Sequence, residues 1–131
     1  MSGMLFIGFD VKKPQGEQGL SDLVNGSYWD AFGDLLDEVL LLDYWKLHAS
    51  IKSEEGEYLK FYTFEDLNSE EFNLAVRLIR EHLFKMEPSM WQARDYITDM
   101  SKWQRMAREV WEEIAEPFVV LDSRYDPKLQ D

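Results

Sequence analysis

Residues 28–42, YWDAFGDLLDEVLLL, constrain the fold more than any other stretch, because their apolar and acidic side chains separate only on an α-helix. At about 100° per residue, with Asp30 at zero, Asp34 falls near 40° and Asp37 near 340°. The large apolar side chains fall roughly opposite, between about 140° and 240°: Tyr28, Phe32, Leu35, Leu36 and Val39. We therefore predict a helix with Ser27 as N-cap and Asp30 in capping-box position, ending near residue 42 and burying one face.

The acidic face of this helix has no basic partner within it. Neither lysine nor arginine stands three or four residues from any of the aspartates, so the like charges repel slightly. Glu38, near 80°, adds a fourth carboxylate, and Leu41, near 20°, places an apolar side chain among them. A solvated helix face is the ordinary interpretation of such a run. An acidic surface with an apolar residue also suits docking into a basic cleft, where complementary charge speeds encounter.

Strand signals occur at three places in the chain. Residues 4–10, MLFIGFD, predict a buried first strand, and the polar residues 11–19 predict a loop. Residues 44–65 hold two aromatic-rich runs on either side of EEG, which predicts a β-hairpin. FVVLD, residues 118–122, predicts a last strand, followed by a polar tail, residues 122–131, that need not be ordered.

Two further helices are expected between the hairpin and the last strand. Asn68 or Ser69 caps the first, which Pro88 ends. Ser89 caps the second, which runs to about residue 115 and stops before Pro117. Its apolar residues step by three and four: Ala93, Tyr96, Met100, Trp103, Ala107, Val110 and Ile114. The order strand, helix, hairpin, helix, helix, strand predicts a two-layer α+β fold with three helices on a small mixed sheet.

Length and composition narrow the class of protein. A chain of 131 residues predicts one domain, residues 1–131. It has no cysteine, which excludes disulfides and thiolate metal sites and suits a reducing compartment. The apolar run at residues 4–9 is too short for a signal peptide, and none approaches the roughly 18 residues that span a bilayer. We expect a soluble, cytoplasmic protein.

Charge is the strongest compositional feature. The net charge is −12, from 26 acids and 14 bases. Residues 28–66 alone hold ten acids and three bases, a net −7 in under a third of the chain. Three of these acids, Glu54, Glu55 and Glu57, lie at the turn of the expected hairpin. Such a balance disfavours nucleic acid and anionic membranes and favours a basic protein partner.

One short segment resembles a known family. NGSYWDAFGDLL, residues 25–36, is similar to the inhibitory segment of barstar-type ribonuclease inhibitors. The matching residues are Gly26, Asp30, Ala31, Phe32, Asp34 and Leu36. The resemblance implies that Asp30 and Asp34 stand in for substrate phosphate in the active site of a basic ribonuclease. It covers about a dozen residues; Gly33 replaces a tryptophan of the family, and the expected hairpin and third helix are additions.

Signals for other chemistry are sparse. The two histidines, His48 and His82, leave open a small hydrolase or metal-dependent enzyme that uses acidic residues and His82. A carboxylate metal site from Asp122, Asp126 and Asp131 is conceivable, but it lacks the EF-hand spacing. There is no nucleotide-binding motif, and no cofactor is expected. A DNA mimic or adaptor that occupies a DNA-binding protein shares the charge argument and also stays open.

The leading hypothesis is a non-enzymatic inhibitor of the immunity-protein or antitoxin type. It would occlude the positive active site of a basic protein, with a nuclease toxin as the leading class of partner. The residues expected to bind that partner are Asp30, Asp34, Asp37, Glu38, Leu41, Glu54, Glu55 and Glu57. Oligomeric state and strand order do not follow from the sequence.

Overall fold

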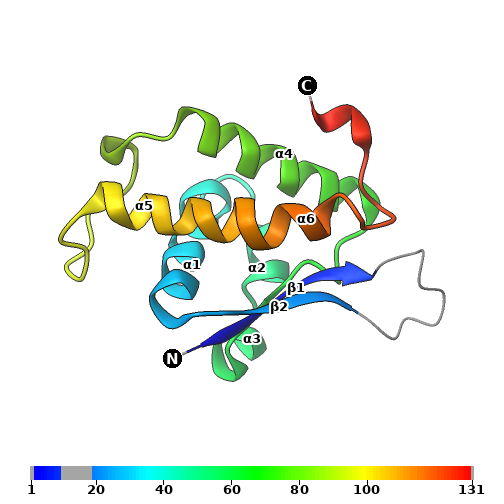
Figure 1. The fold of residues 1–131 in the computed structure, drawn as a ribbon, viewed down its shortest axis with the longest axis horizontal. Coiled ribbons are helices and arrows are strands. Elements are labelled where there is room, and N and C mark those ends of the chain that lie inside the picture. Colours follow the sequence, from blue (N-terminus) through cyan, green and yellow to red (C-terminus); the bar gives the residue numbers. More distant parts are fainter. Residues whose placement is uncertain (1, 10–18, 131) are drawn as a thin grey trace.

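A three-stranded mixed sheet forms one layer of this α+β protein, and helices form the other (Figure 1). The computed structural model describes residues 2–9 and 19–130. β1 (Gly3–Phe9) is the central strand, in the order β2-β1-β3. β2 (Gly19–Val24) pairs with it antiparallel and β3 (Phe61–Thr63) pairs parallel. The two-layer architecture and the mixed sheet are therefore as the sequence predicted.

The helices are more numerous than the three expected. The described residues form α1 (Gly26–Leu40), α2 (Trp45–Ile51), α3 (Glu54–Leu59), α4 (Ser69–Lys85), α5 (Met100–Glu109), α6 (Glu116–Val119), the 3₁₀ turns η1 (Pro88–Met90) and η3 (Pro127–Gln130), and the π-helix η2 (Val110–Ala115). Figure 1 shows α5 and α6 in one rod, with α4 beside it and the β1–β2 pair on the other side. None of these helices is long and apolar enough to cross a membrane in the described part of the chain.

Aromatic side chains join the two layers in the core. Trp111 of η2 is 1% exposed, and its ring stacks on Phe32 of α1 with centroids 6.4 Å apart. Phe64, just after β3, lies 6.3 Å from Trp111 and 6.5 Å from Phe72 of α4. The predicted apolar face of α1 is thus buried, with Phe32, Leu35 and Leu36 each 1% exposed or less. This burial is the main reason that residues 26–40 are helical.

The start of α1 differs slightly from the prediction. Asn25, not Ser27, is the N-cap, and its side chain accepts a hydrogen bond from the Gly26 backbone N–H. Gly33, in the middle of the helix, permits a close approach. A Cβ at Gly33 would stand 2.1 Å from the Tyr62 hydroxyl oxygen, so only glycine lets β3 pack this closely on α1.

The predicted hairpin at residues 44–65 is wrong. The segment folds into α2, α3 and the short strand β3, which pairs with β1 and not with its own neighbour. Ser53 caps α3 by accepting a hydrogen bond from the Gly56 backbone N–H. Lys60 ends α3 in the left-handed conformation, with φ of 63°. The aromatic residues favoured a strand on propensity, and the capping geometry outweighed that preference.

The predicted last strand at residues 118–122 is also wrong. Residues 116–119 form α6, which continues from α5 through η2. Pro117 does not end the helix, because it follows the wider turns of η2, where the regular hydrogen-bond pattern is already altered and a missing N–H costs little. The edge strand that pairs with β1 opposite β3 is instead β2. Gly19, the first residue of β2, was predicted as loop, and the rest of that predicted loop, residues 11–18, lies outside the described residues.

The helix predicted to begin at Ser89 begins at Met100, with Asp99 as its N-cap. Residues 91–99 precede it without regular helix, so the heptad pattern holds only from Met100 onward. α4 forms as predicted, with a reciprocal capping box between Asn68 and Glu71. Residues 122–130, which the sequence allowed to be disordered, include η3 and bond to the rest of the fold.

Candidate protein-binding site

Residues 91–99, here called the strap, cover the acidic face of α1. Tyr96 Oη donates a hydrogen bond of 2.8 Å to Asp34 Oδ2, and Trp103 Nε1, at the start of α5, donates one of 2.9 Å to the same oxygen. Arg94 Nε lies 3.6 Å from Asp34 Oδ1. Asp34 is only 7% exposed as a result. The prediction that it faces solvent is wrong, because its partners lie 60 or more residues away in the chain.

The next two acids of the helix are paired as well. Arg94 Nη1 lies 3.0 Å from Glu38 Oε2, which also accepts a hydrogen bond from the Gln92 backbone N–H. Asp37 accepts from Lys52 Nζ at 2.9 Å and contacts His48 Nε2 at 2.7 Å, which ties α2 to α1. The structure therefore places Asp34, Asp37 and Glu38 in internal ion pairs rather than on a free acidic face.

Four of the predicted site residues remain exposed carboxylates: Asp30, Glu54, Glu55 and Glu57. Among the described residues, none of their side chains has an ion-pair or hydrogen-bond partner. The last three lie on α3, where Tyr58 is 86% and Leu59 57% exposed. Leu41 is 51% exposed, but it lies at the far end of α1, about 16 Å along the helix axis from Asp30. Leu41 therefore lies far from Asp30, although Asp37 and Glu38 are within one helical turn of it.

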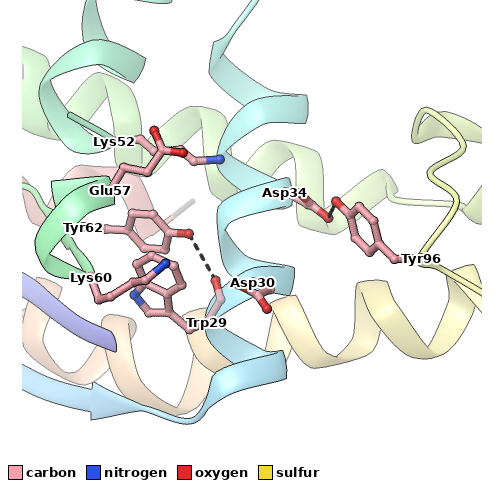
Figure 2. Close-up of a pocket in the computed structure, with 8 residues that line it drawn as sticks. All are labelled: Trp29, Asp30, Asp34, Lys52, Glu57, Lys60, Tyr62 and Tyr96. Carbon is pink, nitrogen blue, oxygen red and sulfur yellow. Dashed lines mark hydrogen bonds between the residues drawn. The ribbon is translucent and has the colours of Figure 1, made fainter. Parts of the chain in front are cut away.

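A cleft of about 360 Å³ lies between α1 and the α3–β3 segment. Figure 2 shows Asp30 and Asp34 on the α1 side and Glu57, Lys60 and Tyr62 on the other. Trp29 and Tyr62 stack at 4.2 Å between centroids, and Tyr62 Oη donates to the Trp29 carbonyl oxygen at 3.3 Å. Lys52 and Tyr96 complete the lining. The cleft therefore has an aromatic wall, two lysines and carboxylates from two different elements, α1 and α3.

The lining of this cleft carries charges of both signs: the carboxylates of Asp30, Asp34 and Glu57, and the lysines Lys52 and Lys60, with Lys60 Nζ 5.6 Å from the centroid of the Trp29 ring. Burial, and then the carboxylates of Asp30, Asp37 and Asp34, raise the pKa of Tyr62 far above its ordinary value. Burial and the hydrogen bond to Asp34 raise the pKa of Tyr96 to about 12. Both hydroxyls therefore keep their protons at neutral pH. Of the carboxylates in the lining, Asp30 and Glu57 have no ion pair among the described residues, and these two would attract a cationic side chain.

The two histidines take part in packing contacts. His48 contacts Asp37, whose two oxygens also accept from Lys52, so the pair is a link between α1 and α2. Trp91 Nε1 donates a hydrogen bond of 2.8 Å to His82 Nε2. The described residues contain no group of three His, Asp or Glu side chains placed to hold a metal ion.

The bond between Trp91 and His82 predicts a pH dependence of stability. His82 Nε2 can accept only when the imidazole is neutral, and burial lowers the His82 pKa below 6.5, with Lys85 acting in the same direction and Glu38 opposing it. As the pH falls, His82 therefore binds a proton more readily in the unfolded chain than in the folded chain. The contribution of the Trp91–His82 bond to stability is complete above about pH 6.5 and is lost as the pH falls below it.

We expect the free energy of unfolding, measured with urea and circular dichroism, to fall between about pH 7.5 and pH 5.5. His82→Gln keeps an acceptor for Trp91 but does not titrate, so it should show a smaller fall over the same range. Because every other titrating group is common to both proteins, identical pH profiles would contradict the prediction.

The site residues that the sequence analysis missed are Tyr58, Leu59, Lys60 and Tyr62. Ser53 followed by Gly56 and three acids in the first turn is a helix-start signal that would have placed the first two on a helix surface. The contact of Tyr62 with Gly33 has no local signal, because it depends on the parallel pairing of β3 with β1.

Comparison with known proteins adds nothing to this geometry. No protein-family model, curated protein or solved structure matches the chain. The functional argument therefore depends on the site itself.

Proposed function

We propose that this protein binds a basic protein through the surface formed by α3 and the mouth of the cleft, here called the α3 face. The observation that carries the proposal is that four carboxylates without an ion pair among the described residues and two exposed apolar side chains share this surface. The acids Asp30, Glu54, Glu55 and Glu57 offer charge complementarity, and Tyr58 offers a large aromatic contact. The net charge of −12 favours the same class of partner at long range.

The mode of binding follows from the cleft. A lysine or arginine side chain of the partner would bind Asp30 and Glu57 at the mouth of the cleft, and it would have to displace Lys60 Nζ, 5.6 Å from the Trp29 ring centroid, to reach the aromatic wall. Asp34, Asp37 and Glu38 would contribute only indirectly, because the strap and α2 already occupy their oxygens. The proposed interface therefore includes fewer acids of α1 than the sequence analysis predicted, and it is centred on α3.

Such a protein would act as a small acidic inhibitor of the immunity-protein or antitoxin type, with a nuclease toxin as the partner class. Nucleases present a basic substrate cleft, which an acidic surface with a protruding aromatic side chain can occlude. The resemblance at residues 25–36 supports this choice at Asp30, which is exposed, but not at Asp34, which is buried.

The test is to capture the partner from a lysate of the source cells with tagged protein at low salt, to elute with a salt step, and to assay the eluted protein for nuclease activity. A basic nuclease that is inhibited by the recombinant protein would support the proposal. If the captured protein is instead a basic DNA-binding protein without nuclease activity, the protein acts as a DNA mimic and not as a nuclease inhibitor. Retention of no stoichiometric basic protein would count against the α3 face as an interface.

Charge reversal identifies the surface. The triple variant Glu54→Lys, Glu55→Lys, Glu57→Lys is expected to weaken binding to the captured partner by at least about 100-fold, mainly through slower association. The matched control reverses three exposed acids that have no ion pair among the described residues and line neither the cleft nor the groove along α4: Asp43→Lys, Asp66→Lys and Glu87→Lys. Surface plasmon resonance at two salt concentrations measures both. Equal losses in the two variants would show that only net charge matters, and no loss in either would exclude the α3 face.

A further inference from the structure

A second surface has the opposite character from the α3 face. An open groove of about 740 Å³ runs along α4 toward the C-terminal turn η3, which Figure 1 shows beside that helix. Its lining includes four basic side chains, Arg77, Arg80, Lys85 and Lys128, and one acid, Glu81. Four of the 14 basic residues of a chain with net charge −12 are therefore gathered in one groove.

The groove also carries an apolar side chain that the fold leaves uncovered. Phe84 is 93% exposed, the highest value among the large apolar residues described. Leu129 of η3 lines the same groove and packs against the core from its other side. An exposed aromatic residue within a concave, charged surface is typical of a site that receives a partner.

The basic groups of the groove differ in their availability. Arg80 is held by Glu116, with Nη2 to Oε2 at 2.7 Å, and by the Tyr125 hydroxyl. Arg77 has only an exposed pair with Glu81 at 3.5 Å. Lys85 and Lys128 have no ion pair within residues 2–9 and 19–130. Lys85 and Lys128, which line the groove together with Phe84, are thus available to meet an acidic ligand.

We propose that this groove binds an acidic amphipathic segment of a partner protein, whose apolar residue packs on Phe84 and whose carboxylates meet Lys85 and Lys128. The carboxylates of such a segment are complementary to the basic side chains of the groove, and its apolar residue is complementary to Phe84. An anionic membrane or a nucleic acid is disfavoured, because the chain as a whole repels extended anionic surfaces. The inference is independent of the α3 face, since the two surfaces share no residue.

The test uses a fluorescein-labelled peptide of about 15 residues with glutamates and with leucine or phenylalanine at i, i+3, i+4 and i+7. Fluorescence anisotropy against the full chain should show saturable binding that weakens with salt. Phe84→Ala should lower the affinity about tenfold, and the pair Lys85→Glu, Lys128→Glu by at least as much. Both variants should fold normally, because the changed side chains are exposed.

Matched controls separate this groove from general effects. Leu59→Ala and Lys46→Glu change exposed residues outside the groove and should leave peptide affinity unchanged. A peptide of the same composition with its apolar residues scattered should bind at least tenfold more weakly. The proposal is overturned by any of three results: no binding at about 1 mM peptide, which is the weak limit for a specific contact; preferential binding of anionic vesicles; or a concentration-dependent dimer that Phe84→Ala abolishes.

Discussion

Replacing Asp34 with alanine is expected to lower the free energy of unfolding by about 3 kcal/mol. The change leaves the Tyr96 hydroxyl, the Trp103 indole N–H and one edge of the Arg94 guanidinium without their shared acceptor. Since Asp34 is 7% exposed, water cannot replace the carboxylate fully. Urea unfolding followed by circular dichroism measures the loss.

The matched control is Asp30→Ala, one helical turn earlier on the same face. Asp30 is exposed and has no partner among the described residues, so its loss should change stability by no more than about 0.5 kcal/mol. The two variants should therefore affect different properties: Asp34→Ala lowers the stability of the fold, and Asp30→Ala weakens partner binding. A stable Asp34→Ala protein with unchanged packing of the strap would show that the strap contacts contribute little.

This contrast shows where prediction from the sequence succeeds. The period of residues 28–42 predicted the buried face of α1, because the core side of a helix is set by local spacing alone. The order of the expected elements predicted the two-layer α+β class, and a local capping signal at Asn68 predicted α4. The spacing of residues 28–42 could not show that Arg94, Tyr96 and Trp103 contact the acids of this helix. These partners lie far later in the chain, and nothing in the sequence of the helix itself indicates them.

The failures at residues 44–65 and 118–122 have a different cause. Both stretches are rich in aromatic or β-branched residues, and strand propensity of this kind yields easily to context. In the first, the Ser53 cap and the left-handed Lys60 favoured a short helix. In the second, η2 carried the helix of α5 past Pro117. The candidate site was therefore only half predicted: Glu54, Glu55 and Glu57 are exposed as expected, but on a helix whose aromatic neighbour Tyr58 was assigned to a strand.

The largest loss of stability is expected from Arg124→Met, about 4–5 kcal/mol. The guanidinium donates to the carbonyl oxygens of Ile7 in β1 and of Phe64 and Leu67 after β3, at 2.7 to 2.8 Å. It also forms a forked pair with Asp122, at 2.8 and 2.9 Å, and its centre lies 4.1 Å from the Phe72 ring. The C-terminal segment is thus bonded to β1 and to the residues that follow β3 through one side chain.

The cause of the loss can be separated with a second substitution. Asp122 is 5% exposed, so removing Arg124 alone leaves a buried carboxylate without its cation. The double variant Arg124→Met, Asp122→Asn removes that charge and should recover about 2 kcal/mol of the loss, while the orphaned carbonyl groups keep the rest. Arg124→Lys should recover little, because an ammonium group cannot reach these acceptors in a planar fork. If the double variant is no more stable than Arg124→Met, the carbonyl contacts and not the buried charge hold the C-terminal segment to the sheet.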